Sequence, residues 1–373
     1  MSFRFNFGLD EDAERVTGAA GAAAEAGSDS DSDSGSAGAP CEAVPLAVPR
    51  VSSIVVDAIY YRGRRLWKRQ LDDVRFQLAQ QDAMDGGQES AAQRAMGAGG
   101  SAVDVVKGVY EGGLKTWECS IDLLGYLVDH GDELFAPGAG VRVLEAGCGT
   151  ALPSLHVLTS VPGAAVCMQD YNRDVMELIT VPNVLANTAL APGGSATGDA
   201  MHAGDDTETC EIDIDYRRTQ VLFGADVDGA IGQRDLPELT ADEAQEADAR
   251  ILRELHAGGR CECIAGDWAN VEAELRRQGR THAFDLVLTS ETIYDTSSYP
   301  RLHGLLECAL ARPGAPGARR PMALVAAKSV YFGLTGSVLS FEQYVRSRGA
   351  FDIERVWASG GSMGREILRM TWR

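Results

Sequence analysis

The residues best placed to do chemistry surround a pair of closely spaced glycines. In Val141–Ala151 (VRVLEAGCGTA), an apolar run leads into Glu145, and Gly147 and Gly149 follow with one residue between them. The next residues, LPSLHVL, have the pattern of the first turns of a helix. Glycines at such a turn let the backbone bend sharply and approach a ligand closely, because they have no Cβ. The segment therefore predicts a nucleotide-binding βα unit, in which Glu145 can meet a ligand amino group.

A carboxylate follows at the spacing at which such units bind a ribose. A second strand-like run, AAVCMQD, ends in Asp170, 21 residues after Gly149. The third glycine of a dinucleotide fingerprint is missing, since Ala151 and Leu152 stand in its place. That departure argues against NAD and favours S-adenosylmethionine, which has no pyrophosphate to bind. The alternative is an ordinary βα turn with a buried glycine.

Composition limits the class of protein. The chain has 373 residues, of which 45% are hydrophobic and 24% charged, which is ordinary for a globular protein. A net charge of −20 disfavours nonspecific nucleic-acid binding and favours basic partners, although solubility alone would also account for it. The eight cysteines include no CxxC pair, so we expect free thiols in a reducing compartment. With no apolar run long enough for a membrane span and an acidic start, we expect a soluble intracellular protein.

Three regions are expected along the chain. Residues 1–50 are rich in Ala, Gly, Ser and acidic residues and predict a disordered tail. Residues 51–101 predict an N-terminal extension and linker, with a strand at 52–61 and a hairpin turn in the basic RGRRLWKRQ. Residues 102–373 predict the main domain. Its insertion at 191–258 is expected to be loop first and then a helix that begins at the capping pattern Thr240 to Glu243.

The main domain alternates strands and helices. The five strands expected in alternation end near residues 145, 169, 265, 290 and 329, and two consecutive strands, FDIERVWA and GREILRMTWR, close the chain. The fold class predicted is α/β, with a Rossmann-like, seven-stranded, mostly parallel sheet and helices on both faces. Ligands of such sheets bind at the carboxyl ends of the strands. Four polar segments fall at such ends: Glu145–Gly149, Gln169–Tyr171, Asp267–Trp268 and Ser290–Tyr294.

Several strings in the same order are similar to a known family. EAGCGTA, MQDYN, GDW and LTSETIY resemble the seven-stranded S-adenosylmethionine-dependent methyltransferases that modify non-histone proteins. GVYEGGLKTWECSIDLL, VLTSETIYDTSSYPRLHGLL and AAKSVYFGLTGSVLSFEQYV resemble, more narrowly, the eukaryotic histidine protein methyltransferases. The resemblance covers about 102–373, except the insertion, and the start MSFRFNFG. It implies methylation of a histidine in a large-subunit ribosomal protein, with S-adenosylmethionine as the cofactor.

The resemblance also implies roles for individual residues. Trp117 and its neighbours would line the cofactor, Gly147 would hold its methionine end, and Asp170 would accept from the ribose hydroxyls. Asp267 and Trp268 would meet the adenine. The cofactor-binding residues implied are Thr116, Trp117, Glu118, Cys119, Ser120, Glu145, Gly147, Gly149, Gln169, Asp170, Tyr171, Gly266, Asp267, Trp268 and Ser290.

Glu291 and Tyr294 match the acid-x-x-Tyr element of this wider group and are the predicted catalytic residues. A neutral imidazole already has one unprotonated nitrogen at pH 7, so the enzyme mainly has to fix its tautomer. We expect Glu291, or a backbone carbonyl near it, to accept from the other ring N–H, and Tyr294 to shape the slot. Lys328, at the end of the fifth strand, is expected to be exposed.

Other interpretations stay open at this point. In the alternative interpretation, Trp117 and Trp268 are core residues, Asp267 is a helix N-cap, and Tyr294 has a structural role. The rival functions are a protein-lysine methyltransferase and a non-catalytic module that binds ribosomal protein. No metal site is predicted. The expected partners are a ribosomal protein or a pre-ribosome, not a membrane or a specific nucleic-acid sequence. We expect a monomer in the cytoplasm and nucleus, including the nucleolus.

Overall fold

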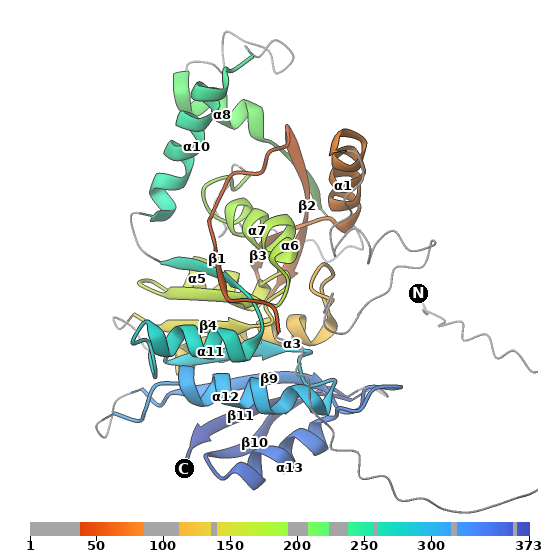
Figure 1. Ribbon diagram of the computed structural model, residues 1–373, viewed down its shortest axis with the longest axis vertical. Helices are drawn as coiled ribbons and strands as arrows, with labels where there is room; N and C mark the ends of the chain where they lie inside the picture. The colour runs from red at the N-terminus through yellow and green to blue at the C-terminus, as the bar shows by residue number, and fades with distance from the viewer. Residues whose placement is uncertain are drawn as a thin grey trace, which may run out of the picture. The chain divides into compact units, whose positions relative to one another are not determined.

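The computed structural model describes residues 38–85, 112–135, 140–192, 208–223, 238–256, 260–314, 319–360 and 364–373 (Figure 1). Residues 1–37 of the predicted tail and the linker predicted near residues 86–101 lie outside these ranges. No helix in the described part of the chain combines the length and the apolar character that a membrane crossing needs.

Within these ranges a large mixed sheet has the strand order β1-β7-β5-β4-β8-β9-β11-β10 (Figure 1). Its strands are β1 (Glu42–Val44), β4 (Arg142–Ala146), β5 (Ala165–Asp170), β7 (Cys261–Ala265), β8 (Leu286–Ser290), β9 (Met322–Lys328), β10 (Phe351–Ala358) and β11 (Arg365–Trp372). The strands from β7 to β9 run parallel, and β11 and β10 follow as antiparallel neighbours. The predicted seven-stranded, mostly parallel sheet is therefore confirmed, and β1 extends it by one strand.

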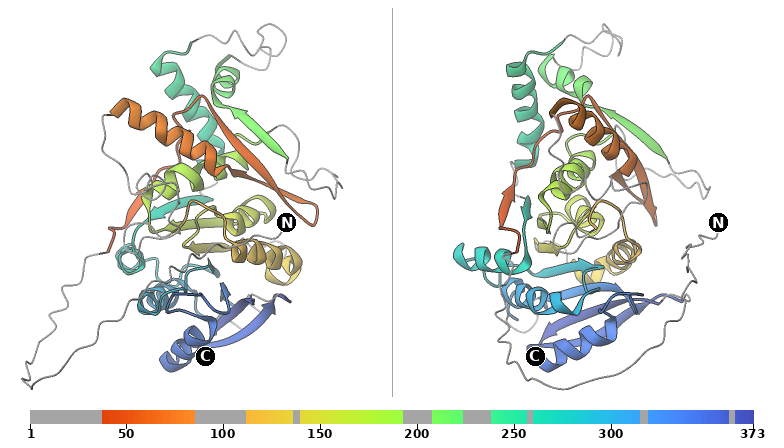
Figure 2. Two further views of the ribbon diagram at one scale, coloured as in Figure 1. Left: turned by 90° about the vertical axis from the view of Figure 1, so that its right-hand side faces the viewer. Right: turned by 45° about the vertical axis from the view of Figure 1, so that its right-hand side comes forward.

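Both faces of this sheet are buried. Successive residues of a strand point to opposite faces, and Val143 and Leu144 of β4 accordingly belong to two different apolar clusters. One face packs on α3 (Glu118–Asp129), α5 (Leu152–Ser160) and α7 (Val181–Ala186). The other packs on α11 (Trp268–Arg277), α12 (Tyr299–Ala309) and α13 (Val338–Arg348) (Figures 1 and 2). Because helices cover both faces, the open positions of the sheet are the loops at its strand ends.

The predicted tail boundary at residue 50 is wrong for residues 38–50, which are part of the fold. β1 pairs antiparallel with β7, with Glu42 opposite Ala265 and Val44 opposite Cys263. Val44, Leu46 and Val48 are buried. Their spacing of two residues is the strand-like signal that the low-complexity composition of the preceding residues concealed.

A second sheet contains β2 (Ser53–Tyr61), β3 (Arg64–Arg69) and β6 (Thr209–Asp213), in the order β3-β2-β6. The predicted hairpin is confirmed, since β2 and β3 are joined at Arg62 and Gly63, both with positive φ, as a tight two-residue hairpin turn needs. The remaining elements of the described residues are α1 (Leu71–Asp85), α4 (Gly131–Leu134), α6 (Arg173–Val175), η1 (Met176–Thr180), α8 (Ile214–Phe223), α10 (Ala241–His256) and η2 (Thr296–Ser298).

The insertion is more structured than its composition suggests. The helix predicted from Thr240 is confirmed as α10, and the side chains of Thr240 and Glu243 exchange the hydrogen bonds of a capping box. The prediction of loop before it is wrong at 208–223, where β6 and α8 form. β6 is stabilised by pairing with β2, in which Ser53 lies opposite Asp213, 160 residues later in the chain. A local sequence pattern does not indicate such a distant partner.

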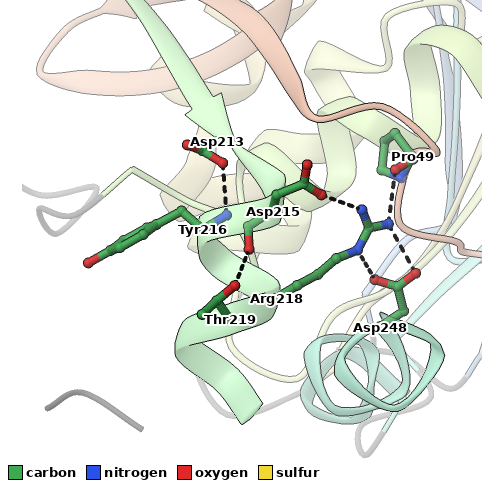
Figure 3. A network of polar contacts seen from close by, with 7 residues as sticks. All are labelled: Pro49, Asp213, Asp215, Tyr216, Arg218, Thr219 and Asp248. Carbon is green, nitrogen blue, oxygen red and sulfur yellow. Dashed lines mark hydrogen bonds and ion pairs between the residues drawn. The ribbon is translucent and has the colours of Figure 1, made fainter. Parts of the chain in front are cut away.

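Arg218 joins three segments of this region (Figure 3). From α8, its guanidinium donates to both carboxylate oxygens of Asp248 on α10, at 2.8 and 3.2 Å. It also donates to Asp215 at 3.0 Å and to the carbonyl of Pro49 at 3.2 Å. The side chain is only 11% exposed, so these bonds compete little with water.

Replacing Arg218 with alanine is expected to lower the free energy of unfolding by roughly 2–3 kcal/mol, because Asp248 would keep a half-buried charge without its partner. Arg250→Ala is the matched control, since it removes only exposed contacts on the same helix pair, an (i, i+4) pair with Glu246 and a 3.3 Å hydrogen bond to the Val221 carbonyl. It is expected to cost at most about 1 kcal/mol. Urea denaturation of both variants measures the difference. Equal losses would contradict the role given to Arg218.

Candidate functional site

The turn between β4 and α5 needs its glycines. Gly147 and Gly149 have φ of +66° and +50°, a region that L side chains rarely adopt. A Cβ on Gly147 would lie 2.7 Å from the Thr292 side chain, and one on Gly149 would lie 3.0 Å from the carbonyl oxygen of Gly113. Two further loops thus lie directly against this turn, one after β8 and one before α3.

Ala151 directly precedes Leu152, which stands at the position of the third glycine of a dinucleotide fingerprint. It is the N-cap residue of α5, with φ +58° and ψ +27°, and it is fully buried. The backbone therefore takes the left-handed conformation that a glycine would allow, at a cost of roughly 1–2 kcal/mol for an alanine. Pro153 falls in the first turn of the helix, where proline is tolerated.

Gln169, the penultimate residue of β5, connects three strand ends. Its side-chain oxygen accepts from the Gly147 N–H at 3.3 Å and from the indole N–H of Trp268 at 3.0 Å, and its amide donates to the Gly266 carbonyl at 2.8 Å. Beside it, Asp170 accepts from the Gly149 N–H at 2.9 Å. The structure thus brings together these predicted residues of three neighbouring strands, and Tyr171 follows directly after them.

Asp267 is a helix N-cap, as the structural interpretation anticipated. One carboxylate oxygen accepts from the Ala269 N–H at 2.9 Å, and the other accepts from Arg301 at 2.7 Å. The segment before β1 packs against the Gly266–Asp267 loop after β7, where the Asp267 N–H donates to the Ala39 carbonyl at 2.9 Å. A Cβ on Gly266 would meet the carbonyl oxygen of Pro40 at 2.5 Å. Arg301 and the segment before β1 were not predicted, and an adenine contact for Asp267 stays a prediction.

The loop before α3 approaches the glycine turn. Thr116 donates to the hydroxyl of Thr150 at 3.3 Å, and the indole N–H of Trp117 donates to the Gly112 carbonyl at 2.9 Å. Cys119 and Ser120, in the first turn of α3, are buried. The side chain of Glu118 is 61% exposed and pairs with Lys328.

Glu291 is the most unusual residue of the site. It follows Ser290 at the end of β8, has φ +57°, and is 8% exposed. Among the described residues, no group donates a hydrogen bond of ordinary geometry to either carboxylate oxygen, although the Tyr331 hydroxyl and the Cys119 thiol lie near enough to interact with it. A buried carboxylate without well-formed hydrogen bonds, on a strained backbone, is costly and marks a candidate functional group.

The residues around Glu291 come from three elements. The Lys328 ammonium lies 3.7 Å from its Oε1, so the predicted exposure of Lys328 is wrong: the side chain is 18% exposed. Burial and the neighbouring Glu291 raise the pKa of both the Tyr331 hydroxyl and the Cys119 thiol. Tyr294 lies further out, with its ring centre 6.3 Å from that of Tyr331. Sequence reasoning missed Tyr331, although it lies in a string that resembles the family.

Burial of Lys328 would by itself lower its pKa, but Glu291 and Glu118 outweigh that effect and raise it. The ammonium therefore stays charged at neutral pH. It also lies 5.3 Å from the centre of the Trp117 ring, within cation–π range. One cation thus links the loop before α3, the end of β8 and the end of β9. The described residues hold no cluster of His, Cys, Asp and Glu suited to a metal ion.

Glu145 is fully buried below the glycine turn. Its Oε2 accepts from the Ser154 N–H at 2.9 Å and so fixes the first turn of α5. Burial raises the pKa of this carboxyl from 4.5 to about 7, although the Ser154 hydrogen bonds act against the shift. A contact between Glu145 and a ligand amino group stays a prediction.

Glu145→Gln is expected to change how stability depends on pH. Between pH 4.5 and 7 the folded protein holds the Glu145 proton more tightly than the unfolded chain does, so this group makes the free energy of unfolding fall as the pH rises. The variant should remove that fall, about 3 kcal/mol across the window. Burial lowers the pKa of His156 to about 4, which gives an opposite trend, so the informative quantity is the difference between variant and wild type.

Urea denaturation at several pH values measures this difference. Glu177→Gln, which changes a carboxylate with a side chain 48% exposed, is the control. If wild type and Glu145→Gln have parallel pH profiles, the raised pKa is refuted.

Sequence comparison with known proteins places this chain in a family. No protein-family model matches the chain. Histidine protein methyltransferase 1 of Saccharomyces cerevisiae is 30% identical over 75% of this chain and 68% of its own length. The homologue of Rattus norvegicus is 31% identical over 72% of this chain, and the protein of Schizosaccharomyces pombe is 29% identical over 82%. The match spans 59% of the rat and mouse proteins.

Solved structures are more distant. A magnesium protoporphyrin IX methyltransferase with bound SAH has 13% identity, covers 81% of this chain and 96% of its own, and has a TM-score of 0.35. The rRNA methyltransferase aviRa has 13% identity over 69% of this chain and 86% of its own, with the same TM-score. The sequence relatives carry the assignment: this chain belongs to the histidine protein methyltransferase 1 family.

Proposed function

We propose that this protein transfers a methyl group from S-adenosylmethionine to a ring nitrogen of a histidine in a protein substrate. The observation that carries the proposal is Glu291, a buried carboxylate with no well-formed hydrogen bond from the described residues, one position before Thr292, whose side chain lies against the glycine turn. Membership of the histidine protein methyltransferase 1 family supports it.

The residues present fit the cofactor. At Gly147 and Gly149 the backbone is free of Cβ atoms, which lets the loops that carry Thr292 and Gly113 pack directly on this turn. The loop before α3 and the ends of β4, β5, β7 and β8 converge around this turn. On the resemblance, Trp117, Gly147 and Asp170 would hold the methionine and ribose portions, and Trp268 would face the adenine.

Bound S-adenosylmethionine would supply an electrophilic methyl group, and its sulfonium would become a neutral thioether. The chain itself has to orient a neutral imidazole. A carboxylate at Glu291 can accept from one ring N–H, which leaves the lone pair of the other nitrogen free to attack. As the N–C bond forms, the ring becomes cationic, and its remaining N–H proton passes to Glu291 and then to solvent. The fixed acceptor thus selects the reactive tautomer.

A basic protein is the substrate class that the charge favours. The net charge of −20 would attract a positively charged partner, and the resemblance implies a histidine of a large-subunit ribosomal protein. We extend the proposal to that substrate, to action as a monomer, and to a site of action in the cytoplasm and nucleus.

The deciding experiment is to incubate the protein with methyl-labelled cofactor and ribosomal proteins from cells that lack it. Amino-acid analysis and mass spectrometry then identify the labelled residue. Methylhistidine is expected. Methyllysine would replace the proposal with lysine methylation, and the absence of label together with no calorimetric binding of the cofactor would favour a non-catalytic binding protein.

Glu291→Gln is expected to reduce turnover by about a hundredfold or more, because an amide is a weaker acceptor and cannot take up the proton. Cofactor affinity, measured by calorimetry, should stay within about twofold, since Glu291 is assigned to the acceptor. Glu177→Gln, an exposed carboxylate, is the control for turnover. Full turnover of Glu291→Gln with unchanged cofactor affinity would remove this assignment.

A further inference from the structure

Lys328 occupies the solvent side of the buried carboxylate. Its ammonium lies 3.7 Å from Glu291 Oε1 and 3.1 Å from Glu118 Oε2. The exposed fraction rises from 6% for the Glu291 side chain to 18% for Lys328 and 61% for Glu118. A substrate side chain that reaches Glu291 therefore meets a carboxylate that already has a cation beside it.

We infer that Lys328 makes the site selective for a neutral ring acceptor, because its ammonium stands at the carboxylate where the ammonium of a substrate lysine would bind. The inference rests on the proposed histidine methylation and names the residue that decides between the two classes of acceptor. In this scheme Lys328 determines specificity and takes no part in the chemical step.

Charge balance in the buried part of the site is the physical basis. Glu291 and Lys328 together are neutral, whereas the charge of the exposed Glu118 is screened by water. A second ammonium would therefore be a poorly compensated charge within a few ångströms of the first. A neutral imidazole brings no charge and needs one hydrogen-bond acceptor, which Glu291 Oε2 provides.

Deprotonating the lysine first does not remove the difficulty. The reference pKa of a lysine is about 10.4, so only a small fraction of lysine side chains is neutral at pH 7. The reference pKa of an imidazole is about 6.5, so most histidine side chains are neutral at the same pH. A lysine acceptor costs free energy by either route, and the histidine acceptor avoids both. The raised pKa of Lys328 is consistent with this, since the ammonium keeps its own proton.

The test compares two synthetic peptides. One carries the histidine that is labelled in the experiment above, within its native sequence, and the other has lysine at that position. Fluorescence anisotropy measures the affinity of both peptides for the full-length protein without cofactor, so the readout does not depend on turnover. Lys328→Met, which keeps an unbranched apolar chain and removes the charge, is the main variant, and Lys328→Gln replaces it if it does not fold.

Wild type should prefer the histidine peptide, and the neutral variant should reduce this preference by about tenfold or more, mainly by binding the lysine peptide better. Lys328→Arg should retain the preference. Lys115→Met is the matched control, since that ammonium lies 4.1 Å from the centre of the same Trp117 ring; it should leave the ratio within about twofold.

An unchanged ratio in the neutral variant, while the labelled residue is a histidine, would overturn this inference and leave the proposed function intact. Label on a lysine would instead overturn the proposed function and this inference together.

Discussion

The hydrogen bonds of Gln169 are the interaction on which the candidate site depends. One buried amide holds the glycine turn after β4 and the corner after β7, and it fixes the indole of Trp268. These segments lie on three adjacent strands, so their relative positions follow from the register of the sheet. Because the amide is fully buried, losing any of these bonds would leave an unpaired polar group inside the protein. Gln169 thereby fixes the carboxyl ends of β4, β5 and β7 relative to one another.

Next to these strand ends, Glu291 has a backbone conformation and a buried carboxylate that would be unfavourable on the surface of the protein. Its backbone adopts a left-handed conformation, and its buried carboxylate receives no well-formed hydrogen bond from the described residues. The cost is met by the surrounding fold, which includes a hydrogen bond from its N–H to the Ala326 carbonyl in β9. A preorganised acceptor of this kind needs no rearrangement when the substrate arrives, which is the usual reason that strain is kept at functional sites.

The sequence predicted the sheet, and the positions of polar residues at its strand ends, because both are encoded locally. Apolar runs that end in Glu145, Asp170 and Ser290 identify the parallel strands and place polar residues at their carboxyl ends. What it did not predict depends on partners far away in the chain. β6 forms only by pairing with β2, and β1 forms only against β7. The local sequence around Lys328 predicts an exposed strand end, whereas the folded chain brings its ammonium close to Glu291.

The pairing of β1 with β7 has a consequence for the order of folding. It joins Glu42 to Ala265, so it closes a loop of more than two hundred residues. Closing a loop of this length costs more chain entropy than forming a local βα unit does, so we expect this pairing to form after the local units. The same segment places the Ala39 carbonyl on Asp267, at the rim of the candidate site. The edge of the candidate site at Asp267 therefore depends on a pairing between residues far apart in the sequence, and a molecule without this pairing would lack the Ala39 contact.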